Sequence, residues 1–156
     1  MTTQKKYELL QNDTINHNGR TLYRIKAITT FGTVFAGTLG GYIEKESNLK
    51  HLGNAWVYDS AKVYDNAEVW GSAKVYDNAK VRSFAVLSER KMIFWASNVG
   101  TENGTLTVYN GKDGLLVTRG CFTGTVEEFL AKSAEVHDEK TKREYQLLIE
   151  VAKSRI

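Results

Sequence analysis

Few side chains in this sequence are of the types that perform acid–base, nucleophilic or metal chemistry. The histidines are His17, His51 and His137, and Cys121 is the single cysteine. None of these residues has a partner at the short spacing that zinc sites use. His17 falls in a predicted turn and His137 at the end of a predicted helix, where it would interact with the helix dipole. His51, nearest the repeats, is the one candidate general base, but the interpretation we prefer for it is a role in capping the neighbouring repeats.

The cysteine and the glycines indicate no further chemistry. Cys121 has no histidine close in sequence, so we expect a small buried residue rather than a nucleophile. The segment Gly37–Gly41 lacks the spacing and the lysine of a phosphate-binding loop. We therefore predict no catalytic residue, no metal ligand and no cofactor.

Aromatic residues are the other chemically distinctive group. Tyrosine and tryptophan are the side chains that most often anchor protein interfaces. We predict an exposed row that serves either as a subunit interface or as a partner-binding surface, composed of Trp56, Tyr58, Tyr64, Trp70 and Tyr76.

Most of these aromatic residues lie in a six-residue repeat. Its units, starting at Val57, read VYDSAK, VYDNAE, VWGSAK, VYDNAK and the degenerate VRSFAV. Each alanine shares a strand face with the valine two residues later, and the Asp-Ser, Asp-Asn or Gly-Ser pairs favour corners. At about 100° per residue a helix would scatter the valines around its axis. Each unit is thus a very short strand ending in a bend, and a meander of tiny antiparallel strands is the alternative arrangement.

The segment Val57–Leu87 resembles the hexapeptide repeats of left-handed parallel β-helices. Three hexads make one triangular turn in that family, which implies that residues 18 apart stack: Val57 under Val75, Tyr58 under Tyr76, and Asp59 under Asp77. The family also implies homotrimers. Its best-known members are acyltransferases with a histidine base, whose counterpart here would be His51. This sequence departs from them by carrying aromatic residues where they often have a small one.

The sequences on either side of the repeats predict smaller modules of one domain, residues 1–156. The fold class is mainly β: a β cap (6–48), a short left-handed parallel β-helix (49–90), a β-hairpin module (91–123) and two C-terminal α-helices (124–156). The hairpin turn is expected at Asn110–Gly114. Thr125 and Glu128 fit a capping box at the start of the first helix.

Composition limits the function classes. The chain has 156 residues and a net charge of +3, and its basic residues are dispersed, so composition does not indicate nucleic-acid binding. The start MTTQKKYELL lacks the apolar core of a signal peptide, and no apolar run approaches membrane-spanning length. With a single cysteine, these features predict a cytoplasmic protein without a membrane partner.

The flanks carry a second resemblance. Gly37–Leu49, Phe94–Tyr109 and Gly120–Ala131 are similar to segments of short proteins from bacteriophages and their hosts, in which variable numbers of VYDNA-type hexads lie between comparable ends. The resemblance implies a phage-associated, non-enzymatic protein. Our hypothesis is a phage-type protein that binds a host protein in the host cytoplasm and inhibits a defence system. The alternatives are a structural or assembly protein and an acyltransferase with His51 as its base.

Overall fold

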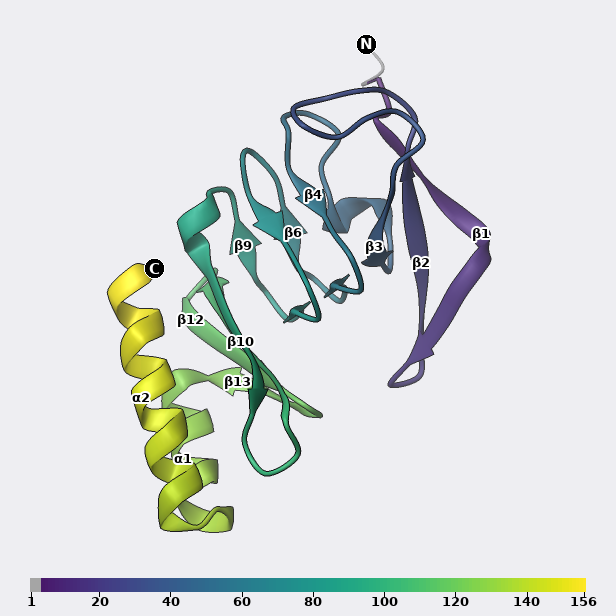
Figure 1. Ribbon diagram of the computed structural model, residues 1–156. Helices are drawn as coiled ribbons and strands as arrows, with labels where there is room; N and C mark the ends of the chain where they lie inside the picture. Colours follow the sequence, from purple (N-terminus) through teal and green to yellow (C-terminus); the bar gives the residue numbers. More distant parts are fainter. Residues whose placement is uncertain (1–3) are drawn as a thin grey trace.

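A computed structural model describes residues 4–156 of the chain (Figure 1). A long hairpin and a third strand come first, a coil of two-residue strands follows, and a four-stranded sheet with two helices completes it. The fold is mainly β with two C-terminal helices, as predicted. The elements are β1 (Tyr7–His17), β2 (Arg20–Ala27), β3 (Leu39–Ile43), β4 (Trp56–Val57), β5 (Lys62–Val63), β6 (Glu68–Val69), β7 (Lys74–Val75), β8 (Lys80–Val81), β9 (Val86–Leu87), β10 (Ile93–Val99), β11 (Gly104–Gly111), β12 (Gly114–Arg119), β13 (Phe122–Thr125), α1 (Val126–Val136) and α2 (Glu139–Arg155).

The short strands of the coil pair in parallel with the strand 18 residues further along. β4 pairs with β7, β5 with β8, and β6 with β9, so the coil has three faces. The predicted stacking of Val57 with Val75 and of Tyr58 with Tyr76 is confirmed. The alternative of an antiparallel meander is wrong, because every one of these pairs is parallel.

The residues of the repeat fall into two groups, those inside the coil and those at its corners. The first valine and the alanine of each hexad are buried inside the coil. The corners need left-handed backbone, with φ near +53° at Asp59 and +57° at Asp77, which aspartate tolerates better than most residues. The Asp77 amide donates to Asp59 Oδ2 at 3.2 Å, so the corner side chain also links successive turns.

The N-terminal strands form a mixed sheet with the coil rather than a separate cap. β1, β2 and β3 are antiparallel, and β3 then pairs in parallel with β5. Lys6, which precedes β1, covers the open end of the coil: its ammonium donates to the carbonyls of Gly53 (3.2 Å) and Ala55 (2.8 Å). Burial lowers the pKa of this ammonium to about 8. The flank thus satisfies backbone groups that a further turn of coil would otherwise bond.

Asn48 closes another part of the same end. It lies in a single 3₁₀ turn, Glu46–Asn48, and its side chain is fully buried. Its Oδ1 accepts from the amides of Glu44 and Lys45, and its Nδ2 donates to the carbonyls of Asp65 and Ala67. One side chain therefore joins β3 to a corner of the coil.

The other end of the coil is covered by the C-terminal sheet. Thr107 Oγ1 accepts from the Lys80 amide at 3.1 Å, and Asn110 Nδ2 donates to the Val86 carbonyl at 3.0 Å. The hairpin predicted at Asn110–Gly114 is present between β11 and β12. The module is larger than a hairpin, since β10 and β13 extend it to an antiparallel sheet in the order β10-β11-β12-β13.

The two helices pack against this sheet on the side away from the hairpin β1–β2 (Figure 1). The predicted capping box opens α1: Thr125 Oγ1 accepts from the Glu128 amide, and the Glu128 carboxylate accepts from the Thr125 amide. Among residues 4–156, neither helix is long and apolar enough to cross a membrane.

The tip of the hairpin β1–β2 folds over the coil and produces a testable pH dependence. The His17 ring contacts the Tyr64 ring at a centroid distance of 5.3 Å. Burial lowers the pKa of His17, and Lys80, Lys62 and Arg82 lower it further. The unfolded chain therefore binds a proton more readily than the folded one just below pH 6.5, so stability is lost as the pH falls through that value.

We expect the melting temperature to fall between pH 7 and pH 5, and to fall less in His17→Gln, which cannot titrate. Thermal unfolding followed by circular dichroism at half-unit pH steps measures the difference. Equal slopes for the two proteins would contradict this assignment.

Candidate functional site

The face of the coil formed by β6 and β9 is the least covered of the three. The face with β4 and β7 is covered at Trp56 by Tyr7 and Phe31. The face with β5 and β8 is covered at Tyr64 by the hairpin tip. On the third face the outward side chains of Trp70 and Val86 stay accessible, and Trp70 is 43% exposed.

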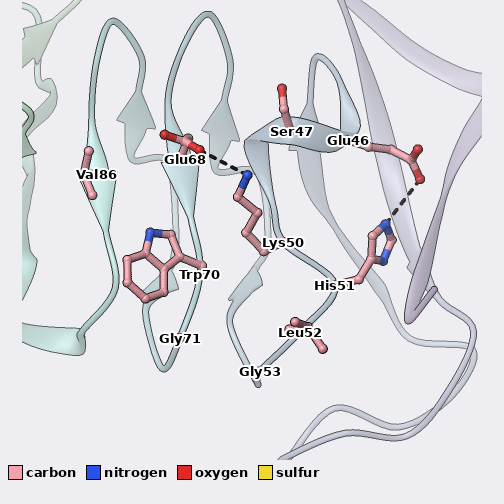
Figure 2. Close-up of a pocket in the computed structure, with 10 residues that line it drawn as sticks. All are labelled: Glu46, Ser47, Lys50, His51, Leu52, Gly53, Glu68, Trp70, Gly71 and Val86. Atoms are coloured by element: carbon pink, nitrogen blue, oxygen red, sulfur yellow. Dashed lines mark hydrogen bonds and ion pairs between the residues drawn. The ribbon is translucent and has the colours of Figure 1, made fainter. Parts of the chain in front are cut away.

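A cleft of about 880 Å³ lies on this third face. Figure 2 shows Trp70 and Val86 at one end of it, the Lys50–Glu68 pair in the middle, and His51 at the other end. Leu52 lies beside the glycine corner and is 74% exposed. We call this site the Trp70 cleft, defined by the lining residues Glu46, Ser47, Lys50, His51, Leu52, Gly53, Glu68, Trp70, Gly71 and Val86.

The cleft arises where the regular pairing of the coil is interrupted. The Lys50 amide donates to the carbonyl of Val69, nineteen residues on, whereas the Asn54 amide donates to that of Gly71, seventeen residues on. Between these two hydrogen bonds, the segment from Lys50 to Asn54 is two residues longer than the segment from Val69 to Gly71 with which it pairs. The two extra residues must therefore bulge outward, as in a β-bulge. The bulge carries Leu52 outward and leaves it unpacked.

The hexad that departs from the consensus is the one beside the bulge. Where the other three regular units read VYD, this one reads Val69-Trp70-Gly71, and at the position usually held by lysine or glutamate the degenerate last unit has Val86. Gly71 has φ +63°, and a Cβ there would lie 2.5 Å from the Ser88 carbonyl oxygen. Glycine is thus required at this corner.

Charge in the cleft is balanced. Lys50 Nζ lies 3.1 Å from Glu68 Oε1, and both side chains are nearly half exposed. Such a pair contributes little to stability. A partner would therefore meet a mainly apolar cleft with one positive and one negative group in its middle.

His51 lies at the rim of the cleft, but both of its ring nitrogens are engaged. The Lys6 amide donates to Nδ1 at 3.1 Å, and because an amide can only donate, the ring proton resides on Nε2. Nε2 is 3.3 Å from Glu46 Oε1, and the ring stacks on Tyr7 at 4.3 Å. This geometry supports the capping role for His51, since no basic nitrogen is free to accept a proton from a substrate.

The predicted aromatic row is not a continuous exposed surface. All five residues point outward from the coil, but the flanks cover Trp56 and Tyr64 completely. Tyr58 and Tyr76 stack on each other at 4.2 Å and are half-buried. The expectation of exposure was therefore wrong for Trp56 and Tyr64, because strand parity tells which side of the coil a residue occupies and not what lies over it. Trp70 is the member that the structure places in a cleft.

The expectation for the cysteine was also wrong. Cys121 is exposed in the turn between β12 and β13. His137 Nδ1 shares a hydrogen bond with Ser133 Oγ at 2.8 Å, and Ser133 lies one helical turn earlier. Among the described residues, no three His, Cys, Asp or Glu side chains gather as metal ligands.

Comparison with known proteins gives one short similarity. No family model matches the chain. A stretch of 38 residues, 24% of this chain, is 50% identical to the uncharacterized acetyltransferase YdcK of Escherichia coli strain K12, and it covers 12% of that protein. This similarity supports the description of the chain as a hexapeptide-repeat protein. The chain therefore spans only a small part of the relative that it matches.

Proposed function

We propose that this protein acts by binding a protein partner through the Trp70 cleft. The observation that carries the proposal is the coincidence of three features at one place: an exposed tryptophan, an exposed leucine and a glycine corner. A tryptophan on a rigid scaffold is the side chain that most often contributes a large share of binding energy. The glycine corner lets successive turns of the coil approach each other closely beside Trp70, because a Cβ at Gly71 would meet the Ser88 carbonyl oxygen.

The partner that fits the sequence resemblance is a host protein. In this proposal the chain is a phage-type inhibitor of a host defence system and acts in the host cytoplasm. We further propose that the coil is a short left-handed parallel β-helix, which is supported by parallel pairing at 18-residue intervals, and that the protein is a homotrimer. Light scattering coupled to gel filtration measures the oligomer directly.

Trp70→Ala is expected to weaken binding of the host partner about thirtyfold, which corresponds to the ~2 kcal/mol of a central aromatic anchor. Partners captured by the wild-type protein are identified by mass spectrometry, and the affinity of the purified partner is then measured for each variant. Phe35→Ala is the matched control, because Phe35 is an exposed aromatic residue (72%) outside the cleft. A partner that binds Trp70→Ala and wild type equally would overturn the proposal.

Acyl transfer is the second candidate function. The similarity to an acetyltransferase favours it, and the volume of the cleft lies in the range of small-molecule sites. An acyltransferase would bind acetyl-CoA in a calorimetric titration and lose that binding in His51→Ala. A structural or assembly protein, the remaining alternative, would self-associate and recover no host partner.

A further inference from the structure

A cluster of cations lies on the face of the coil formed by β5 and β8, away from the Trp70 cleft. Lys62 and Lys80 are register neighbours in parallel strands, which places their backbones about 4.8 Å apart. Both point outward, because the alanine and valine on either side of each are inside the coil. Like charges directly opposite each other on a sheet destabilise it. Burial and the charge of Lys80 lower the pKa of Lys62 accordingly.

Two more basic side chains complete the cluster. Arg82 follows Lys80 by two residues on the same strand face, at a backbone distance of roughly 7 Å. Its guanidinium lies over the Tyr64 ring, 5.3 Å from the centroid, and its Nε is buried without a hydrogen-bond partner. His17 approaches from the hairpin tip and is close enough for all three cations to lower its pKa.

Acidic side chains do not neutralise this cluster. Among residues 4–156, no carboxylate lies within ion-pair distance of Lys62, Lys80 or Arg82. The nearby carboxylates of Glu44 and Asp65 are both held by Arg20, at 3.1 and 3.4 Å. On the Trp70 face, by contrast, the neighbouring positions carry a lysine opposite a glutamate.

We propose that Lys62, Lys80, Arg82 and His17 form a binding site for a phosphate-bearing ligand. Three half-buried cations at these spacings suit an anion with several charged oxygens, such as a diphosphate group. The arginine supplies a forked donor and the lysines supply point charges. The unpartnered Nε of Arg82 and the partly buried ammonium of Lys62 would gain hydrogen-bond acceptors. This site differs from the protein-binding cleft in both place and chemistry.

The ligand would also remove the repulsion between the cations. A bound diphosphate places negative charge between Lys62 and Lys80, and it favours the protonated form of His17. By linkage, the His17 ring should therefore titrate at higher pH in the complex than in the free protein.

Calorimetric titration of the full chain with pyrophosphate at fixed ionic strength tests the proposal. We expect binding to wild type, and at least tenfold weaker binding to Lys62→Gln/Lys80→Gln. That variant should fold, because it loses like charges that repel each other. The matched control is Lys74→Gln/Lys132→Gln, which removes the same charge elsewhere and should bind as wild type does.

Equal weakening in the two double variants would show a general charge effect and overturn the site, as would the absence of binding to wild type. A titration with ADP distinguishes the source of the phosphate. Tighter binding of ADP than of pyrophosphate assigns the site to nucleotides, and the reverse order assigns it to free phosphate anions. Nuclear magnetic resonance of the His17 ring during the titration reports occupancy independently of heat.

Discussion

Trp56→Ala is expected to lower the free energy of unfolding by about 3–5 kcal/mol, the usual cost of removing a buried aromatic side chain. Trp56 is the largest side chain that the structure buries completely, and it is enclosed by Tyr7 and Phe31. The cavity left by the indole would lie between the coil and the segments that cover it, the hairpin β1–β2 and the loop after it.

Trp70→Ala provides the comparison, with an expected loss of about 1 kcal/mol because its indole is 43% exposed. Urea denaturation followed by circular dichroism measures both values, since each substitution removes one of the three tryptophans and so alters the fluorescence signal itself. Replacement of Trp56 is thus expected mainly to lower stability, and replacement of Trp70 mainly to weaken binding. Similar destabilisation by both substitutions would show that the Trp70 face is covered in solution, for example by a second copy of the chain.

Asn48→Ala is expected to cost about 2–4 kcal/mol, because it removes four hydrogen bonds and leaves buried backbone groups without partners. The Lys45 amide and the carbonyls of Asp65 and Ala67 would need new partners, whereas the Glu44 amide keeps the Val63 carbonyl at 3.3 Å. The same urea titration measures the change.

Asn66→Ala is the matched control for Asn48. Asn66 is an exposed asparagine at the corner to which Asn48 bonds, and its replacement should change stability by about 0.5 kcal/mol or less. If Asn48→Ala were as mild as this control, the end of the coil would not depend on its side-chain cap, and another group would have to replace it.

Much of the fold could be predicted because the repeat is strict. A valine and an alanine in each hexad specify the buried face, and the corner residues specify where the strand bends. The parallel stacking of Val57 with Val75 follows from this phase. The start of α1 could be predicted for a similar reason, since Thr125 and Glu128 carry a local hydrogen-bonding pattern. Signals of this kind lie within a few residues of one another.

The site could be predicted less well because it depends on contacts between distant segments. The bulge at His51–Gly53 results from pairing with residues 69–71, and no local pattern marks it. Burial of Trp56 and Tyr64 depends on how the hairpin β1–β2 folds back over the coil. One signal was available in the sequence, because Trp70-Gly71 interrupts an otherwise regular Tyr-Asp series. Such a departure indicates where the regular stacking of the repeat changes.

The side-chain caps at the two ends of the coil also restrict how its length can change. Thr107 bonds to the face with β8, and Asn110 bonds to the face with β9, so each cap residue recognises a particular face. Adding one hexad would advance the chain by one face and bring every cap residue to the wrong side. Adding three hexads would insert a complete turn and return each face to its own cap. Chains built on this plan should therefore grow or shorten in steps of 18 residues, because only a complete added turn keeps each face of the coil opposite its own cap residue.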